Sequence, residues 1–226
     1  MKRLIKIYSN IFIRYSKIFS RKNLYKFLKD AVKEYCKRES LSILNIGAGG
    51  EISKILKKQG LKFKEIDIDP EKKPDYILDI ENIYIIKNNS IDIIFCLDVL
   101  EHVKNPFNAI EEIKRILKKG GLFIGSTPFM IPIHEEPYDF YRFTKYGIIN
   151  LFKNFRCLEL KERNNYAETI YVLFVRLYNV GNILQRIIAV LLTPLFIILL
   201  PLFFILRFVI TNKQATTGYF YIFKNE

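Results

Sequence analysis

The sequence lacks the features that mark several common protein classes. Its three cysteines are widely spaced and form no CxxC pair, so the sequence supports neither a disulfide framework nor a zinc site. The first 20 residues hold no signal-peptide core, because Lys6, Arg14 and Lys17 interrupt every apolar run. We therefore expect reduced thiols and a folded domain on the cytosolic side.

Acidic residues are in the minority. The chain of 226 residues has 23 Asp and Glu against 36 Lys and Arg, a formal net charge of +13. This excess suggests an anionic partner, such as nucleic acid or an acidic lipid surface, although a Lys-rich compositional bias of the source explains it equally well. The length and the 50% hydrophobic content predict one catalytic-sized domain with an appendage.

The chain is organised around residues 41–51, LSILNIGAGGE, an apolar run followed by a glycine cluster. Glycine permits a sharp turn and lets peptide N–H groups approach a ligand closely. The GxGxxG pattern of dinucleotide sites is absent, and so is the Walker pattern that ends in Gly-Lys-Ser/Thr. A nucleoside without phosphates therefore suits this turn better than a diphosphate ligand.

Strand and helix signals alternate along the chain. After a helical pattern that begins at residue 23, strands are predicted at 41–46, 61–67, 76–78, 91–97, 121–126 and 155–160. Between them, Asn105-Pro106 begins a helix that we expect to end at 118–120, and Thr144 caps another. This alternation predicts a doubly wound α/β fold with a mostly parallel sheet.

The residues that are candidates for binding a ligand lie at the ends of these strands. Gly47 and Gly49 end the first strand, Asp67 ends the second, Asp79 follows the third and Leu97-Asp98 ends the fourth. In such a sheet the ligand lies outside the carboxyl ends of the strands. One acid there can accept both ribose hydroxyls, and another can accept from an adenine amino group, so the set indicates a nucleoside site.

Over residues 24–155 the chain resembles the class I S-adenosylmethionine-dependent methyltransferases, in particular a bacterial branch acting on small molecules or glycans. The resemblance is carried, in order, by LNIGAGG, EIDIDP, NSIDIIFCLDVLEHVKNP and LKKGGLFIGSTP. It implies a seven-stranded Rossmann-like sheet and S-adenosylmethionine as cofactor. The chain departs from the family pattern at Asn45, where an acid is common, and at Glu51, where glycine is. The implied cofactor-binding residues are Gly47, Ala48, Gly49, Asp67, Ile68, Asp79, Ile80 and Leu97.

Residues 128–144, PFMIPIHEEPYDFYRFT, resemble the acceptor-side loop of the same branch. His134 is a candidate general base, and Tyr138, Asp139 and Arg142 are candidates for binding the acceptor. The alternative is that these residues brace the loop, with Asp139 and Arg142 as a local ion pair. We expect no metal site here, because adjacent residues such as His134 and its two glutamate neighbours rarely point at one ion.

The stretch 187–206 carries no charge and has about the 20 residues that span a bilayer core. Pro194 and Pro201 favour bends within it. Residues 217–224, TGYFYIFK, resemble the final antiparallel strand of the methyltransferase sheet, and a single crossing is incompatible with a strand that joins that sheet. We therefore expect 166–214 to form a monotopic or re-entrant helical hairpin. The alternatives are one transmembrane helix with a detached tail and a buried dimer interface.

These predictions divide the chain into N-terminal basic, amphipathic helices (1–40), a methyltransferase core (41–165), the apolar insertion (166–214) and the last strand (215–226). The predicted function is methyl transfer at the cytoplasmic side of the cell membrane, to an acceptor such as a lipid-linked sugar or another lipid intermediate. Nucleic-acid methylation is one alternative, although an Asn/Asp-Pro-Pro-Tyr motif is absent. A non-catalytic, membrane-anchored protein with a nucleotide-binding fold is another.

Overall fold

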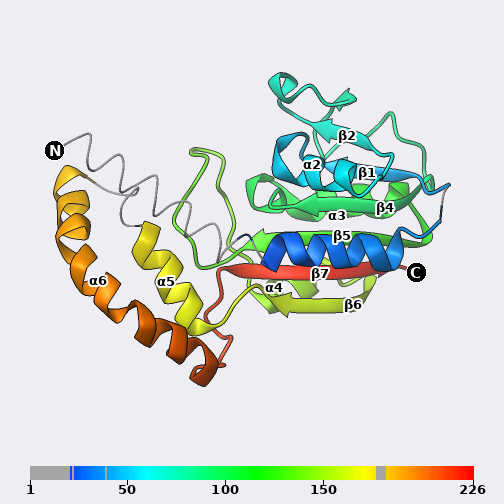
Figure 1. The fold of residues 1–226 in the computed structure, drawn as a ribbon. Helices are drawn as coiled ribbons and strands as arrows, with labels where there is room; N and C mark the ends of the chain where they lie inside the picture. The colour runs from blue at the N-terminus through cyan, green and yellow to red at the C-terminus, as the bar shows by residue number, and fades with distance from the viewer. Residues whose placement is uncertain (1–20, 22, 39, 177–181) are drawn as a thin grey trace. The chain divides into compact units, whose positions relative to one another are not determined.

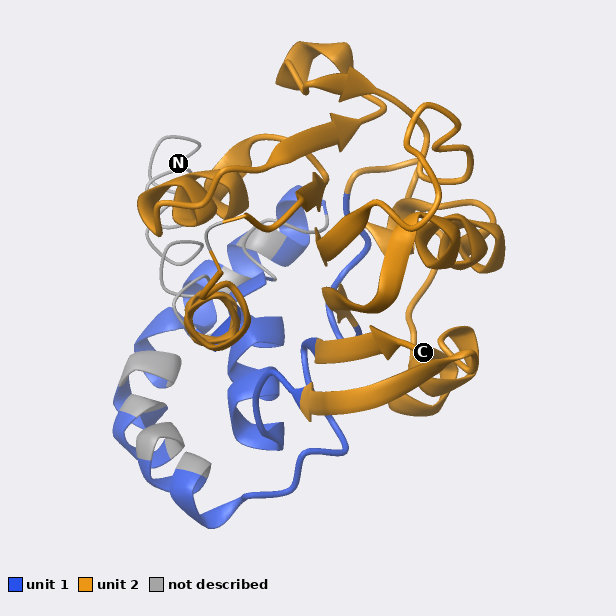
Figure 2. Ribbon diagram, turned by 90° about the vertical axis from the view of Figure 1, so that its right-hand side faces the viewer, with its two compact units in different colours: residues 1–24, 129–134, 162–218 blue, residues 25–128, 135–161, 219–226 orange. Residues whose placement is uncertain are grey.

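The computed structural model describes residues 21, 23–38, 40–176 and 182–226. The chain divides into two compact units (Figure 2): residues 1–24, 129–134 and 162–218 form the first, and residues 25–128, 135–161 and 219–226 form the second. The amphipathic segment predicted at the N-terminus falls largely on residues 1–20, outside the described residues.

The second unit is built on one seven-stranded sheet with the order β3-β2-β1-β4-β5-β7-β6 (Figure 1). The neighbouring strands β3, β2, β1, β4 and β5 pair in parallel, and the β5-β7-β6 end is antiparallel. The predicted fold, a mostly parallel Rossmann-like sheet with an antiparallel last strand, is confirmed. The strands are β1 (Ile43–Ile46), β2 (Lys64–Asp67), β3 (Tyr76–Ile77), β4 (Ile91–Leu97), β5 (Leu117–Pro128), β6 (Phe155–Glu162) and β7 (Gly218–Asn225).

Strand β4 lies inside the sheet, and its apolar sequence explains why. All its side chains are buried except that of Asp92, and Cys96 is fully buried, as predicted for a strand covered on both faces. The Asp92 carboxylate accepts a hydrogen bond of 2.9 Å from Ser42 N and lies 2.8 Å from Lys118 Nζ. The one acidic residue of the strand is therefore paired at the edge of the core.

Helices connect the strands and cover both faces of the sheet (Figure 2). They are the helix over residues 23–35, α2 (Gly50–Lys58), α3 (Pro106–Ile116) and α4 (Lys145–Leu151), with the short 3-10 helices η1 (Pro70–Lys72) and η2 (Leu100–His102). The predicted starts of α3 and α4 are confirmed by side-chain caps, because Asn105 accepts from Asn108 N and Thr144 accepts from Gly147 N.

The predicted end of α3 at residues 118–120 is wrong. The helix ends at Ile116, and Leu117 already belongs to β5, where it is fully buried and pairs with Ile91 of β4. Lys118, which lies within the predicted helix end, instead pairs with Asp92. Burial of Leu117 in the sheet therefore sets the end of α3, and the lysines that follow do not.

The first unit contains two helices in the apolar stretch, α5 (Tyr166–Arg176) and α6 (Ile183–Val209), which contact each other. Helix α6 begins with a capping box formed by Asn182 and Gln185 and contains Pro194 and Pro201. The single-crossing alternative requires a helix that is long and apolar enough to cross a membrane, and the described residues contain none.

Candidate active site

The turn after β1 is made of residues in conformations that favour glycine. Gly47, Gly49 and Gly50 have φ values of +90°, +74° and +64°. A Cβ added to Gly47 would lie 2.7 Å from Val99 Cγ2, well inside van der Waals contact. The turn therefore runs directly against the segment that follows β4, which is the edge of the sheet where the sequence predicts the ligand.

Asp67, at the end of β2, is fastened to this turn. Its Oδ2 accepts a hydrogen bond of 2.8 Å from Ala48 N and lies 3.2 Å from Lys72 Nζ, while its Oδ1 accepts from Asp69 N at 2.9 Å. The side chain is buried. The structure thus brings Asp67 to the glycine turn, as expected from the strand order, while the contact with ribose stays a prediction.

The residues implied for adenine differ in exposure. Ile68 is 69% exposed beside Asp67, whereas Ile80 and Leu97 are buried. Asp79 is exposed, and its Oδ1 accepts from Glu81 N at 2.9 Å. Ile68 is therefore an exposed apolar side chain between two acids, an arrangement that can contact the face of an adenine ring while the acids accept from its polar groups.

A buried polar network lies behind the turn. Asn45 is fully buried, and its Nδ2 donates to Gly47 O at 3.2 Å and to Glu65 Oε1 at 3.1 Å. Glu65 Oε1 also accepts from Gly49 N at 3.3 Å and from the Ser53 hydroxyl. Burial alone raises the pKa of Glu65, but the hydrogen bonds from Ser53, Asn45 and Gly49 outweigh it, so the pKa lies below its ordinary value.

These residues fit S-adenosylmethionine. Gly47 has no side chain between its backbone and Val99, and Asp67 and Asp79 offer acceptors for hydroxyl and amino groups. Within the part of the chain that the structure describes, Asn45 Oδ1 is buried and accepts no hydrogen bond. An orphaned acceptor beside the turn suits an N–H donor such as the amino group of the cofactor.

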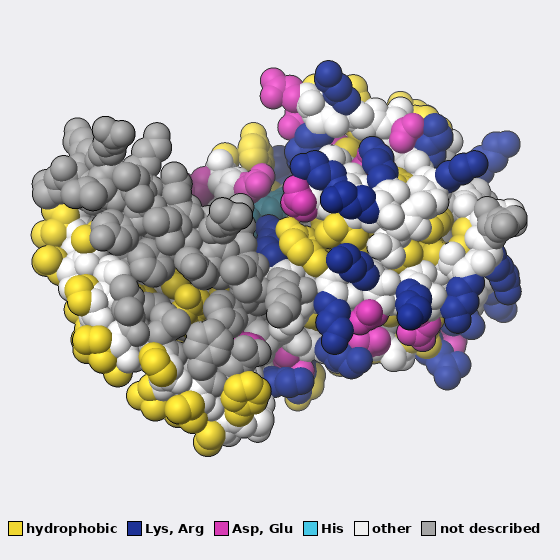
Figure 3. Space-filling model, viewed as in Figure 1, with side chains coloured by type: hydrophobic (Ala, Val, Ile, Leu, Met, Phe, Trp, Pro, Cys, Tyr) yellow, Lys and Arg dark blue, Asp and Glu magenta, His cyan; other side chains and the backbone are white. Residues whose placement is uncertain are grey.

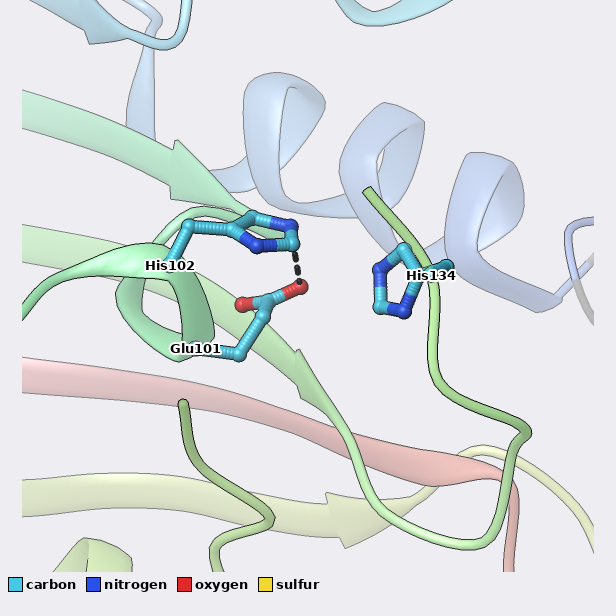
Figure 4. Close-up of side chains that lie close together, drawn as sticks. All are labelled: Glu101, His102 and His134. Atoms are coloured by element: carbon cyan, nitrogen blue, oxygen red, sulfur yellow. Dashed lines mark ion pairs between the residues drawn. The ribbon is translucent and has the colours of Figure 1, made fainter. Parts of the chain in front are cut away.

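The acceptor-side residues of the second unit lie along η2. His102 Nδ1 lies 2.7 Å from Tyr138 O, so this nitrogen carries the proton and donates it to the carbonyl. Phe140 N donates to Glu101 O at 2.9 Å. Glu101 is fully buried, and its Oε1 is 3.7 Å from His102 Nε2 (Figure 4). The segment that carries the candidate acceptor residues is thereby held against η2.

Asp139 and Arg142 form an ion pair with two contacts, as the alternative that these residues brace the loop predicts. Hydrogen bonding to Asp139 is the main cause of a raised pKa of Arg142. Arg142 also donates to Tyr141 O at 2.8 Å. Tyr138, in contrast, is 60% exposed and can meet an acceptor from solution.

His134 belongs to the first unit and is half-buried there. Its segment is paired with the residues that precede β7, because Phe129 N donates to Thr217 O at 2.9 Å and Met130 N to Thr216 O at 3.1 Å. Its predicted role as a base stays a prediction.

Sequence reasoning missed two residues near the turn, Glu65 and Ser53, and it placed Asp98 at the end of the fourth strand without assigning it a contact. Glu65 stands two positions before Asp67, and a period of two places both on one face of β2, which was a readable signal. Asp98 has a φ of +56°, and the fully buried Ser126 donates to its Oδ1 at 2.9 Å. Nothing in the local sequence indicates that backbone conformation.

Comparison with known proteins supports this assignment. Residues 44–125 match the family model described as a methyltransferase domain. The comparison with curated proteins finds no match to the chain. Among solved structures, the fold is similar to that of an S-adenosylmethionine-dependent methyltransferase from Archaeoglobus fulgidus, with 14% identity, a TM-score of 0.60 and coverage of 94% of this chain and 99% of that one.

Two further structures show how widely the fold is used. The [4+2]-cyclase SpnF is similar with 12% identity and a TM-score of 0.58, covering 89% of this chain and 81% of that one. Phosphoethanolamine N-methyltransferase 2 from Haemonchus contortus, solved with S-adenosyl-L-methionine, has 14% identity and a TM-score of 0.53, covering 88% of this chain and 52% of that one. At these identities the likeness shows the fold alone.

The fold is the Rossmann-like fold of the methyltransferases, and residues 44–125, which span most of its first five strands, match a methyltransferase domain. The protein is an S-adenosylmethionine-dependent methyltransferase, and S-adenosylmethionine is its cofactor.

Proposed function

We propose that this methyltransferase acts at the cytoplasmic face of the cell membrane, on an acceptor such as a lipid-linked sugar or another lipid intermediate. The observation that carries the proposal is the surface of α6 in the first unit. An apolar stripe of exposed side chains recurs there at alternating intervals of four and three residues (Figure 3): Leu184, Ile188, Leu191, Leu195, Ile198, Leu202, Ile205 and Val209.

Intervals of four and three residues place these side chains on one face of the helix. They are between 47% and 73% exposed, and an apolar face of this length is unusual on a protein surface. Covering each one gains about 1 kcal/mol, since each is already partly buried, so the stripe offers on the order of 8 kcal/mol before the costs of association. The net charge of +13 favours an anionic leaflet as the covering surface.

The chemistry asks for positioning more than for covalent work by the protein. S-adenosylmethionine supplies a methyl group that its sulfonium already activates, so holding an acceptor in line with that group provides much of the acceleration. In this proposal Tyr138 contacts the acceptor and the Asp139–Arg142 pair holds the loop that presents it. His134 takes a proton where the acceptor must lose one.

Membrane association is tested by sedimenting the full chain with vesicles of phosphatidylcholine alone or mixed with phosphatidylglycerol. We expect binding to the anionic vesicles and at least a tenfold loss in the variant I198D/I205D. The control is Ile149→Asp, which places one such charge at a 46% exposed apolar residue of α4, and it is compared with each single substitution, Ile198→Asp and Ile205→Asp, as well as with the double variant. Wild-type protein that stays in the supernatant would overturn the proposal, and concentration-dependent self-association without vesicle binding would assign the stripe to a dimer interface.

The acceptor class is tested with cofactor labelled on its methyl group, incubated with cell membranes and purified protein. We expect label in the lipid extract and a slower rate for His134→Gln with unchanged cofactor binding. Label found only in nucleic acid would support the alternative function.

A further inference from the structure

The buried network behind the glycine turn has one carboxylate at its centre. Glu65 on β2 lies opposite Asn45 on β1 in the parallel register of the two strands. A single oxygen, Glu65 Oε1, accepts hydrogen bonds from Asn45 Nδ2, from Gly49 N and from the Ser53 hydroxyl. One atom thus gathers donors from β1, from the turn and from α2.

This carboxylate binds the backbone N–H at the N-cap position of α2. Helix α2 has Gly49 at its N-cap position, and glycine brings no side chain to accept from the free N–H groups of the first turn. Glu65 accepts from Gly49 N across the strand, and its negative charge faces the positive end of the helix dipole. Lys57 Nζ, 3.4 Å from Glu65 Oε2, adds a cation on the outer side.

The two side chains occupy one buried space. Asn45 Nδ2 donates to Gly47 O as well as to Glu65 Oε1, so an acid at position 45 would lose the bond to Gly47 O while bringing its negative charge into the same space. Two carboxylates in that space would repel each other. With no carboxylate there, Gly49 N and the N-terminus of α2 would face no negative charge. The arrangement therefore calls for one acid and one amide.

We propose that Glu65 is a positioning residue for the cofactor turn, and that Asn45 and Glu65 form an exchangeable acid–amide pair. The turn requires one buried negative charge, and in this chain β2 supplies it. This inference depends on the assignment of the glycine turn to S-adenosylmethionine, which wild-type binding tests separately.

The test measures the affinity for S-adenosylmethionine by calorimetry in Glu65→Gln, Asn45→Asp and the double variant N45D/E65Q. We expect each single substitution to weaken binding at least tenfold, the first by removing the charge and the second by doubling it. The double variant restores one acid and one amide, so its affinity should return to within about threefold of wild type. Glu51→Gln is the control, because Glu51 is an exposed acid in the same helix that pairs with Lys54, and we expect no change there.

Recovery in the double variant separates positioning from general destabilisation, since two harmful and independent substitutions would add. Losses that multiply in the double variant, or wild-type affinity in Glu65→Gln, would overturn the inference. Where a single variant fails to fold, Ser53→Ala leaves both Glu65 and Asn45 in place and removes the Ser53 hydroxyl, which contacts Glu65, Asn45 and Gly49 O, and we expect two- to fivefold weaker binding. No binding by wild-type protein would instead overturn the cofactor site and with it the inference.

Discussion

Substitution of Gly47 by alanine tests the glycine turn most directly. The residue has a φ of +90°, and its added Cβ would lie 2.7 Å from Val99 Cγ2. Holding a residue other than glycine at such a φ costs about 1–3 kcal/mol. Overpacking of this kind costs a further 1–3 kcal/mol or so, since carbon atoms prefer a separation of about 3.5–4.0 Å.

A matched control separates the two costs. Gly60 has a similar φ of +77°, but a Cβ there would meet nothing within 4 Å. Gly60→Ala should therefore lose only the conformational share of stability and keep its cofactor affinity. In Gly47→Ala the turn or Val99 must move, and a loss of about 1.4 kcal/mol in binding corresponds to a tenfold weaker affinity for S-adenosylmethionine.

The assays are denaturant unfolding and calorimetric titration with S-adenosylmethionine. The variant G47A/V99A removes the methyl group that clashes, and we expect it to recover most of the lost affinity. The reasoning fails if Gly47→Ala binds the cofactor as tightly as wild type and loses no more stability than Gly60→Ala.

Three further predictions concern other parts of the catalytic unit. Asp67→Asn should weaken cofactor binding at least tenfold in calorimetry, because the carboxylate that fastens the turn through Ala48 N loses its charge; unchanged affinity would count against the site. Iodoacetamide should modify Cys157 well before Cys96 in native protein followed by mass spectrometry, since Cys96 is fully buried and its burial raises the pKa of the thiol well above the ordinary value; equal rates would refute this. Burial alone raises the pKa of Asp92, but the ion pair with Lys118 and the backbone hydrogen bond from Ser42 outweigh burial, so the pKa lies below its ordinary value. The carboxylate therefore stabilises the fold at neutral pH, and this contribution is lost as the pH falls through the lowered pKa. The stability gap between wild type and Asp92→Asn should therefore narrow in acid, and a gap that widens would contradict the sign.

The strands and the glycine turn were predictable because their signals are local. The apolar run of β4 needs cover on both faces wherever it lies, and glycines at 47 and 49 indicate a turn without reference to the rest of the chain. Asp67 could be assigned to the same edge because parallel strands end together. The end of α3 could not be read locally, since it depends on Leu117 reaching its partner on β4.

The sequence by itself determined the class of fold, the position of the glycine turn and the acids that follow the strands, because these depend on periodicity and on the backbone freedom of glycine. Only the tertiary structure decided which side chains support that turn. Glu65 is twenty residues from Asn45 along the chain, and their hydrogen bond exists because β1 and β2 pair in one register. Likewise, Asp139 could have bound an acceptor or Arg142, and the geometry of the folded loop gives it Arg142. Contacts between strands depend on register, which no local pattern in one sequence specifies.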